Sequence, residues 1–144
     1  MQHENSIIIN KPLKEVVRLF ENENNLYEWH ANLKKIKPIT GKKRQTGYEA
    51  IMVYEIQGRS FELQEKVVLN NLPEQFISEH LHQGVYNRVE HCFEAETEEV
   101  TRWTTVNTLE LRGWKKIFGI FMKSNMKSTA LQTARAFKAF AESK

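Results

Sequence analysis

The stretch from Trp114 to Phe140, WKKIFGIFMKSNMKSTALQTARAFKAF, decides how the rest of the chain is interpreted. Its apolar residues recur at intervals of three and four, the spacing of one face of a helix. The stripe comprises Trp114, Phe118, Phe121, Met122, Met126, Ala130, Thr133, Phe137 and Phe140. A helix of about 30 residues is about 45 Å long and needs an equally large apolar partner. We therefore predict one long helix that closes a sheet.

The residues before this stretch alternate with the period of β-strands. Strand-like segments are Ser6–Ile9, Ile36–Thr40, Tyr48–Ile56, Phe61–Asn70, Gln75–His82, Tyr86–Ala95 and Thr101–Leu111. After the first strand, Pro12 opens a predicted short helix at Leu13–Phe20, and a second follows at Leu26–Leu33. Short connections favour antiparallel pairing. The prediction is an α+β fold in one domain, residues 1–144, with a strongly curved seven-stranded antiparallel sheet wrapped around the long C-terminal helix.

The composition excludes several classes of function. The net charge of +3 comes from 21 basic and 18 acidic residues spread along the chain, so no nucleic-acid partner is predicted. The lone Cys92 has no disulfide partner, and no signal peptide or membrane-spanning run is visible. We therefore expect a soluble cytoplasmic protein without stable membrane insertion. The absence of Asp excludes aspartate triads and Asp-rich calcium loops.

No motif in the chain predicts a cofactor or a metal ion. There is no Gly-rich phosphate loop, no nucleophile motif and no dinucleotide fingerprint. His80 and His82 lie on one side of a predicted strand and could share a metal, but no third ligand is spaced to join them. The run Trp114–Lys123 mixes aromatic residues with lysines, as membrane-surface helices do, yet the same stripe is needed to cover the sheet.

Strand alternation predicts polar groups on the inner face of the sheet. If Phe61, Leu63 and Val67 face inward, Glu65 does so as well. On the next two strands, alternation brings His91 and Asn107 to one face each, where they could meet Glu65 in a polar patch together with Thr105. Glu65 is then an acid–base group or ligand anchor, or it forms an ion pair with a neighbouring strand or lies near the solvated rim.

Several residues together resemble START-like proteins of the SRPBCC superfamily, which have the helix-grip fold. They are Ile7-Ile8-Ile9-Asn10-Lys11-Pro12, Glu15-Val16-Val17, Phe20, Trp29, the turn at Gly47, and the ending from Leu131 through Phe137 to Glu142. The resemblance covers the whole chain in order of elements but includes no catalytic signature. It implies a cavity between sheet and closing helix that holds a hydrophobic molecule, and it places Trp29 near the cavity entrance.

Three functions follow from this resemblance. The first is an intracellular protein that encloses a small hydrophobic ligand, a lipid, polyketide or aromatic-like compound. Its predicted lining is Trp29, Tyr54, Phe61, Leu63, Phe93, Trp103, Asn107, Phe118, Met122 and Met126. The second is a polyketide cyclase or dehydratase with Glu65 or His91 as the catalytic group that moves a proton beside a substrate carbonyl. The third is a protein-interaction or chaperone-cofactor module. A homodimer through an exposed strand or the closing helix is an open alternative.

Overall fold

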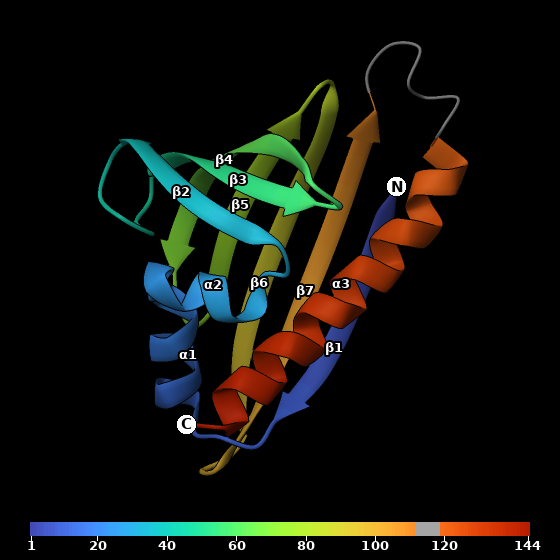
Figure 1. Cartoon of the computed structure of the whole chain (residues 1–144). Coiled ribbons are helices and arrows are strands. Elements are labelled where there is room, and N and C mark those ends of the chain that lie inside the picture. The colour runs from blue at the N-terminus through green and yellow to red at the C-terminus, as the bar shows by residue number, and fades with distance from the viewer. Residues whose placement is uncertain (112–118) are drawn as a thin grey trace.

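The computed structural model describes residues 1–111 and 119–144 and contains one antiparallel sheet (Figure 1). The strands are β1 Gln2–Ile9, β2 Leu33–Thr40, β3 Glu49–Ile56, β4 Arg59–Asn71, β5 Gln75–His82, β6 Val85–Thr97 and β7 Val100–Leu111. The sheet order is β1-β7-β6-β5-β4-β3-β2, so β1 and β2 are its edges. The helices are α1 Leu13–Glu21, the 3₁₀ helix η1 Glu23–Asn25, α2 Leu26–Trp29 and α3 Gly119–Glu142. The predicted fold class is confirmed.

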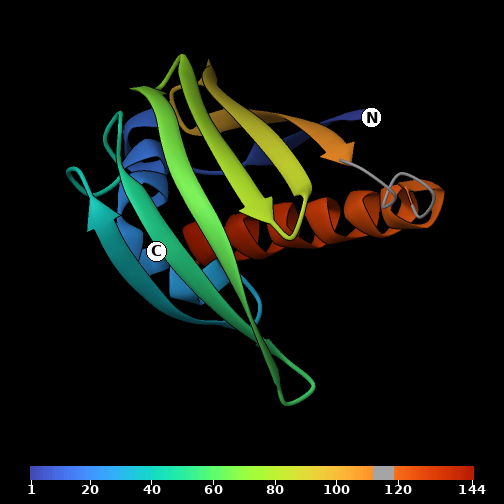
Figure 2. The ribbon, with the colours of Figure 1, turned by 90° about the horizontal axis from the view of Figure 1, so that it is seen from above.

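The sheet is strongly curved, and all the helices lie on its concave side (Figures 1 and 2). The long helix α3 runs along this side and packs against β1 and α2. The short helices α1 and α2 follow β1 in the chain and lie on the concave side of the sheet. Strand β2 begins shortly after α2 (Figure 1). The C-terminal helix therefore has the place that its apolar stripe predicts.

Two element ends differ from the prediction or lie outside the described residues. The helix α2 ends at Trp29 rather than at Leu33, because His30 adopts an extended backbone and Asn32 has a positive φ of 68°. Asparagine tolerates this left-handed conformation, which turns the chain into β2. The predicted start of α3 at Trp114 falls outside the described residues, and the helix is continuous from Gly119. Within the described ranges, no helix is long and apolar enough to cross a membrane.

An aromatic cluster around Phe20 of α1 forms the centre of the core. The Phe20 ring centroid lies 4.9 to 6.1 Å from those of Trp29, Phe76, His91, Phe93, Trp103 and Phe137. These rings come from two helices other than α1 and from three strands, so the cluster joins the sheet to the helices. Phe20, Phe76 and Phe137 are at most 1% exposed. Burial of this aromatic surface stabilises the fold.

Candidate functional site

The register of the strands fixes which side chains face the concave side. Residues directly opposite each other on paired strands share a face. Leu63 lies opposite the buried Met52, and Glu65 lies opposite the buried Ala50. The inward-facing residues of β4 are therefore Phe61, Leu63, Glu65 and Val67, as strand alternation predicts.

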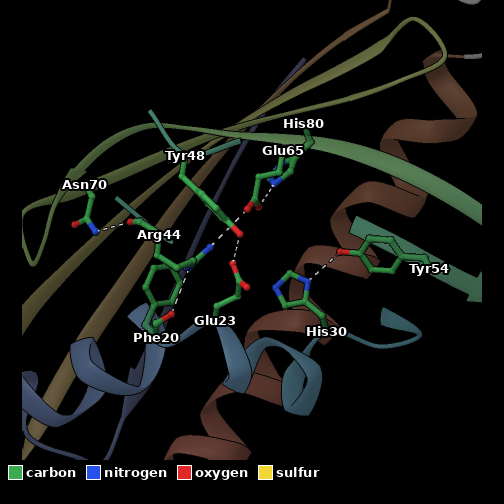
Figure 3. A network of polar contacts seen from close by, with 9 residues as sticks. All are labelled: Phe20, Glu23, His30, Arg44, Tyr48, Tyr54, Glu65, Asn70 and His80. Atoms are coloured by element: carbon green, nitrogen blue, oxygen red, sulfur yellow. Dashed lines mark hydrogen bonds and ion pairs between the residues drawn. The ribbon is translucent and has the colours of Figure 1, made fainter. Parts of the chain in front are cut away.

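Glu65 is the centre of a buried ionic network that also contains Arg44 and His80 (Figure 3). One carboxylate oxygen of Glu65 lies 2.8 Å from Nε2 of His80, its direct neighbour on β5. The other lies 3.8 Å from the Arg44 guanidinium. Glu65 is 5% exposed and Arg44 4% exposed. The pairing of Glu65 with a neighbouring strand, one of the sequence-based alternatives, is thus present.

Arg44 reaches the interior from the segment between β2 and β3. Its backbone has a positive φ of 63°, and its guanidinium lies 4.6 Å from the ring centroid of Phe76 and 5.2 Å from that of Phe20. Its Nη2 donates to the carbonyl of Phe20 at 3.3 Å, while Asn70 donates to the Arg44 carbonyl at 2.7 Å. A cation between aromatic faces is stabilised by their quadrupoles. These contacts hold the guanidinium against Glu65.

The charge state of Glu65 follows from its partners. Burial raises its pKa, but the hydrogen bond from His80 and the charges of His80 and Arg44 outweigh burial and lower the pKa to about 2. Glu65 is therefore a carboxylate near neutral pH and can only accept hydrogen bonds. A group held so firmly in its charged form is a poor proton acceptor but a good orienting partner for the imidazole of His80.

A second polar pair joins α2 to β3. The ring nitrogen Nδ1 of His30 lies 3.3 Å from the hydroxyl of Tyr54, and the two side chains point toward one another (Figure 3). Burial lowers the pKa of His30 to about 4, partly opposed by the charge of Glu65. Burial and the same carboxylate raise the pKa of Tyr54. Both groups are therefore neutral at neutral pH.

His91 belongs to the aromatic cluster and not to the Glu65 network. Its Nδ1 accepts a hydrogen bond from the indole Nε1 of Trp103 at 3.2 Å, and the two rings are stacked with centroids 5.8 Å apart. Burial, followed by the charge of Arg44, lowers the pKa of His91 to about 3. The imidazole is neutral, and the nitrogen that could take a proton is already occupied by the indole.

The predicted lining residues fall into two groups. Trp29, Phe93 and Trp103 lie in the aromatic cluster and are 2 to 4% exposed. Tyr54 and Phe61 stack on each other with centroids 5.3 Å apart and are, like Leu63, only partly buried. The first group is packed core, and the second retains accessible surface on the concave face.

The remaining predicted residues are placed as follows. Asn107 is 7% exposed and lies opposite Val89 of β6, away from the contacts of Glu65. Phe118 lies outside the described residues, and so do the side chains of Met122 and Met126. Among the described residues, no group of three His, Cys, Asp or Glu side chains is arranged to hold a metal. The interior polar groups that the structure brings together are thus those of the Glu65 network and the His30–Tyr54 pair.

An open groove of about 610 Å³ lies at the ends of β3, β4 and β5. Its lining includes Phe61 and His82, whose rings touch edge to face with centroids 5.5 Å apart. Both residues are inward-facing, since Phe61 lies opposite Tyr54 and His82 follows His80 by two positions. Most of the lining is on the convex face, because Ile51, Gln64 and Leu81 lie opposite one another and alternate with the inward-facing residues. The groove is therefore mainly a feature of the convex face that reaches the concave side at Phe61 and His82.

Arg44 and His80 are the site residues that sequence reasoning missed. His80 was considered above only as a possible metal ligand, and the signal for its pairing with Glu65 was incomplete: Pro73 marks a short turn between β4 and β5. Counting outward from that turn would place Glu65 opposite Leu81. The register shift between Val67 and Leu69 brings His80 opposite Glu65 instead, and no sequence signal marks that shift. No such signal exists for Arg44, since its segment is irregular and its contacts are set by tertiary packing.

Comparisons with known proteins support the fold. By sequence, no protein-family model and no curated protein matches this chain. A START superfamily protein from Mycobacterium smegmatis aligns with a TM-score of 0.81, 12% identity and coverage of 99% of this chain and 97% of that protein. The ZhuI aromatase/cyclase from Streptomyces sp. R1128 aligns with a TM-score of 0.81 and 11% identity, and the alignment covers 99% of this chain and 93% of that protein. Ara h 8.0201 aligns with a TM-score of 0.79 and 9% identity, and the alignment covers 100% of this chain and 99% of that protein. At these identities the likeness is one of fold, and the chain has the helix-grip fold of START-like proteins.

Proposed function

We propose that this protein binds a small hydrophobic ligand between the concave face of the sheet and the closing helix. One observation carries the proposal: many inward-facing side chains keep accessible surface although they face the interior. They are Tyr54, Phe61, Leu63, His80, His82, Val85, Asn87 and Val89. A filled core buries such positions, as the aromatic cluster does. The fold shared with the START superfamily protein and the aromatase/cyclase is consistent with this role.

The composition of this surface favours an apolar ligand with a polar end. The stacked rings of Tyr54 and Phe61 and the side chain of Leu63 offer apolar contact. The polar groups among the side chains of this surface are the imidazoles of His80 and His82, the amide of Asn87 and the hydroxyl of Tyr54. His30 and Tyr54 are neutral at neutral pH. Ligand sites of this kind are largely apolar with a small number of orienting polar groups.

The test is a pair of matched Val→Trp substitutions, one on the concave face of the sheet and one on the convex face. Val89 of β6 faces inward opposite Asn107, whereas Val106 of β7 lies opposite Glu90 on the convex face. In Val89→Trp the indole occupies the interior space, and Val106→Trp is the control. We expect wild type and Val106→Trp to bind the neutral fluorescent probe N-phenyl-1-naphthylamine equally. Val89→Trp should bind it at least tenfold more weakly.

Thermal unfolding of each variant accompanies the titration, so that loss of binding is separated from loss of folding. Equal binding by folded Val89→Trp and wild type would contradict an interior site. Absence of probe binding by the wild type would contradict it as well.

A second candidate function, proton transfer on a bound carbonyl compound as in polyketide cyclases or dehydratases, is favoured by the Glu65–His80 pair. A carboxylate that fixes one ring nitrogen of an imidazole orients the other as a base, a recurring arrangement in acid–base catalysis. The proton-transfer group would be His80, which is partly accessible, rather than His91, whose Nδ1 accepts from Trp103. Glu65 and Arg44 would be positioning residues.

This candidate is tested by deuterium exchange at the methyl group of 2-acetylnaphthalene in D₂O, followed by NMR. His80 would take a methyl proton to leave the enolate and then return a deuteron. We expect exchange above the buffer rate with wild type. Glu65→Gln should retain binding of N-phenyl-1-naphthylamine and lose the exchange. Exchange at the buffer rate with a wild-type protein that binds the ketone would exclude the candidate.

A further inference from the structure

The ionised Glu65 determines which nitrogen of His80 can meet a ligand. A carboxylate has no hydrogen to donate, so the 2.8 Å contact requires the hydrogen to be on Nε2 of His80. When the imidazole of His80 is uncharged, Nδ1 therefore carries a lone pair and is an acceptor. The His80 side chain is 16% exposed and faces the concave side.

A second acceptor lies directly beside His80. Asn87 of β6 is the cross-strand partner of His80, and such directly opposed side chains have Cβ atoms about 4.5 to 5.5 Å apart. The amide oxygen of Asn87 is buried and has no hydrogen-bond partner among the described residues. An unpaired buried acceptor is destabilising, and a donor from a ligand would remove that cost. The soft χ2 torsion of asparagine lets this oxygen turn toward such a donor.

Like His80, His82 donates through one ring nitrogen, which leaves the other nitrogen as the possible acceptor. Its Nδ1 lies 2.7 Å from the carbonyl oxygen of Glu62, which can only accept, so Nδ1 carries the hydrogen. When this ring is uncharged, Nε2 is an acceptor, and the imidazole touches the ring of Phe61. Arg44, the cation of this region, is paired with Glu65 through Nη1, while its buried Nε has no hydrogen-bond partner among the described residues.

From these contacts we infer that the ligand ends in a hydroxyl group, as a hydrophobic phenol or alcohol does. This hydroxyl shares its one hydrogen between the acceptors of His80 and Asn87 in a three-centre hydrogen bond. The inference rests on the proposed interior site. A carboxylate end would place its charge against two lone pairs close to Glu65. A ketone end would leave both acceptors without a hydrogen. A hydroxyl end supplies a hydrogen to these acceptors and places no negative charge close to Glu65.

The experiment compares three probes that share one ring system: 2-naphthol, 2-acetylnaphthalene and 2-naphthoate. Dissociation constants are measured by calorimetry at about pH 8, above the ordinary pKa of histidine and below that of a phenol. We expect wild type to bind 2-naphthol about tenfold more tightly than either of the other probes. Asn87→Leu, which removes the unpaired oxygen, should reduce this preference about fivefold. Asn71→Leu, at the exposed end of β4, is the matched control.

Glu65→Gln provides a further test, because a role of Glu65 in packing alone would not predict the changes expected in this variant. Arg44 has only hydrogen-bond donors, so it should hold the oxygen of the new amide and turn the NH₂ group toward Nε2 of His80. Nε2 must then accept, and the hydrogen of His80 moves to Nδ1. We expect the preference to reverse in favour of 2-acetylnaphthalene. The ¹⁵N shifts of the His80 ring should show the change of tautomer.

The outcomes separate the inference from the proposed function. Binding of all three probes with equal affinity, or tighter binding of 2-naphthoate by wild type, would overturn the inference and leave the interior site in place. An unchanged tautomer and preference in folded Glu65→Gln would also overturn it. Failure of every naphthyl probe to bind would instead contradict the interior site itself.

Discussion

The buried neutral histidines should make the protein lose stability as soon as the pH falls below the ordinary range of histidine. In the unfolded chain both imidazoles protonate near pH 6.5, whereas in the folded protein the pKa of His30 is about 4 and that of His91 about 3. A folded-state pKa that is depressed means that the unfolded state binds more protons between these values. The free energy of unfolding therefore falls as pH decreases through this window.

The linkage relation gives the size of the effect. Between about pH 6.5 and about pH 5, each histidine contributes a loss of roughly 1.5 kcal/mol, or about 3 kcal/mol together. The loss from Glu65 begins only below its ordinary pKa of 4.5. His91→Gln keeps an acceptor for the indole of Trp103 but does not titrate. We expect this variant to lose about half as much stability over the same interval as wild type.

The assay is urea unfolding followed by tryptophan fluorescence at several pH values. The substitution also removes ring stacking, so the variant will be less stable at every pH. Above about pH 7.5 that difference should be constant, because both forms are then uncharged at position 91. An equal loss of stability in variant and wild type between about pH 6.5 and about pH 5 would refute the buried, neutral state of His91.

Three further substitutions test the parts of the fold that position the site. Glu65→Leu should cost about 3 to 5 kcal/mol in urea unfolding, because it leaves Arg44 buried without its carboxylate, and the double variant with Arg44→Met should recover most of that loss. Tyr54→Phe should cost about 1 kcal/mol by the same measurement, since it removes one partly buried hydrogen bond. Gly41→Ala should destabilise more than Gly58→Ala: both positions have a positive φ, but a Cβ at Gly41 would lie 2.9 Å from the Tyr48 backbone, whereas at Gly58 it meets nothing within 4 Å. Equal melting temperatures for the two alanine variants would contradict this packing.

The architecture could be predicted from the sequence because it depends on periodicity. The alternation along β4 placed Glu65 on the inner face before its partners were known. The apolar stripe of the C-terminal segment likewise required a sheet to cover it. Both inferences need only the local geometry of one element. Element ends were less certain, as the end of α2 at Trp29 shows, because the extended backbone of His30 stops the helix before the left-handed turn at Asn32.

The partners of the site could not be predicted in the same way. The pairing of Glu65 with Arg44 depends on how an irregular segment folds over Phe20 and Phe76. The position of His91 in the aromatic cluster depends on the rotamer that brings its Nδ1 to Trp103. Alternation assigns a side chain to a face but says nothing of its hydrogen bonds. The predicted polar patch of Glu65 and His91 therefore resolves into separate ionic and aromatic groups.

The most direct test of the central proposal is native mass spectrometry of gently purified protein. An interior ligand site predicts a defined small-molecule adduct on the wild-type chain that is released on denaturation and extracted into organic solvent. The adduct should persist in Val106→Trp and be absent from Val89→Trp. An adduct that survives unchanged in folded Val89→Trp would place the ligand elsewhere and contradict the account. So would a wild-type protein that carries no adduct and takes up none of the naphthyl probes.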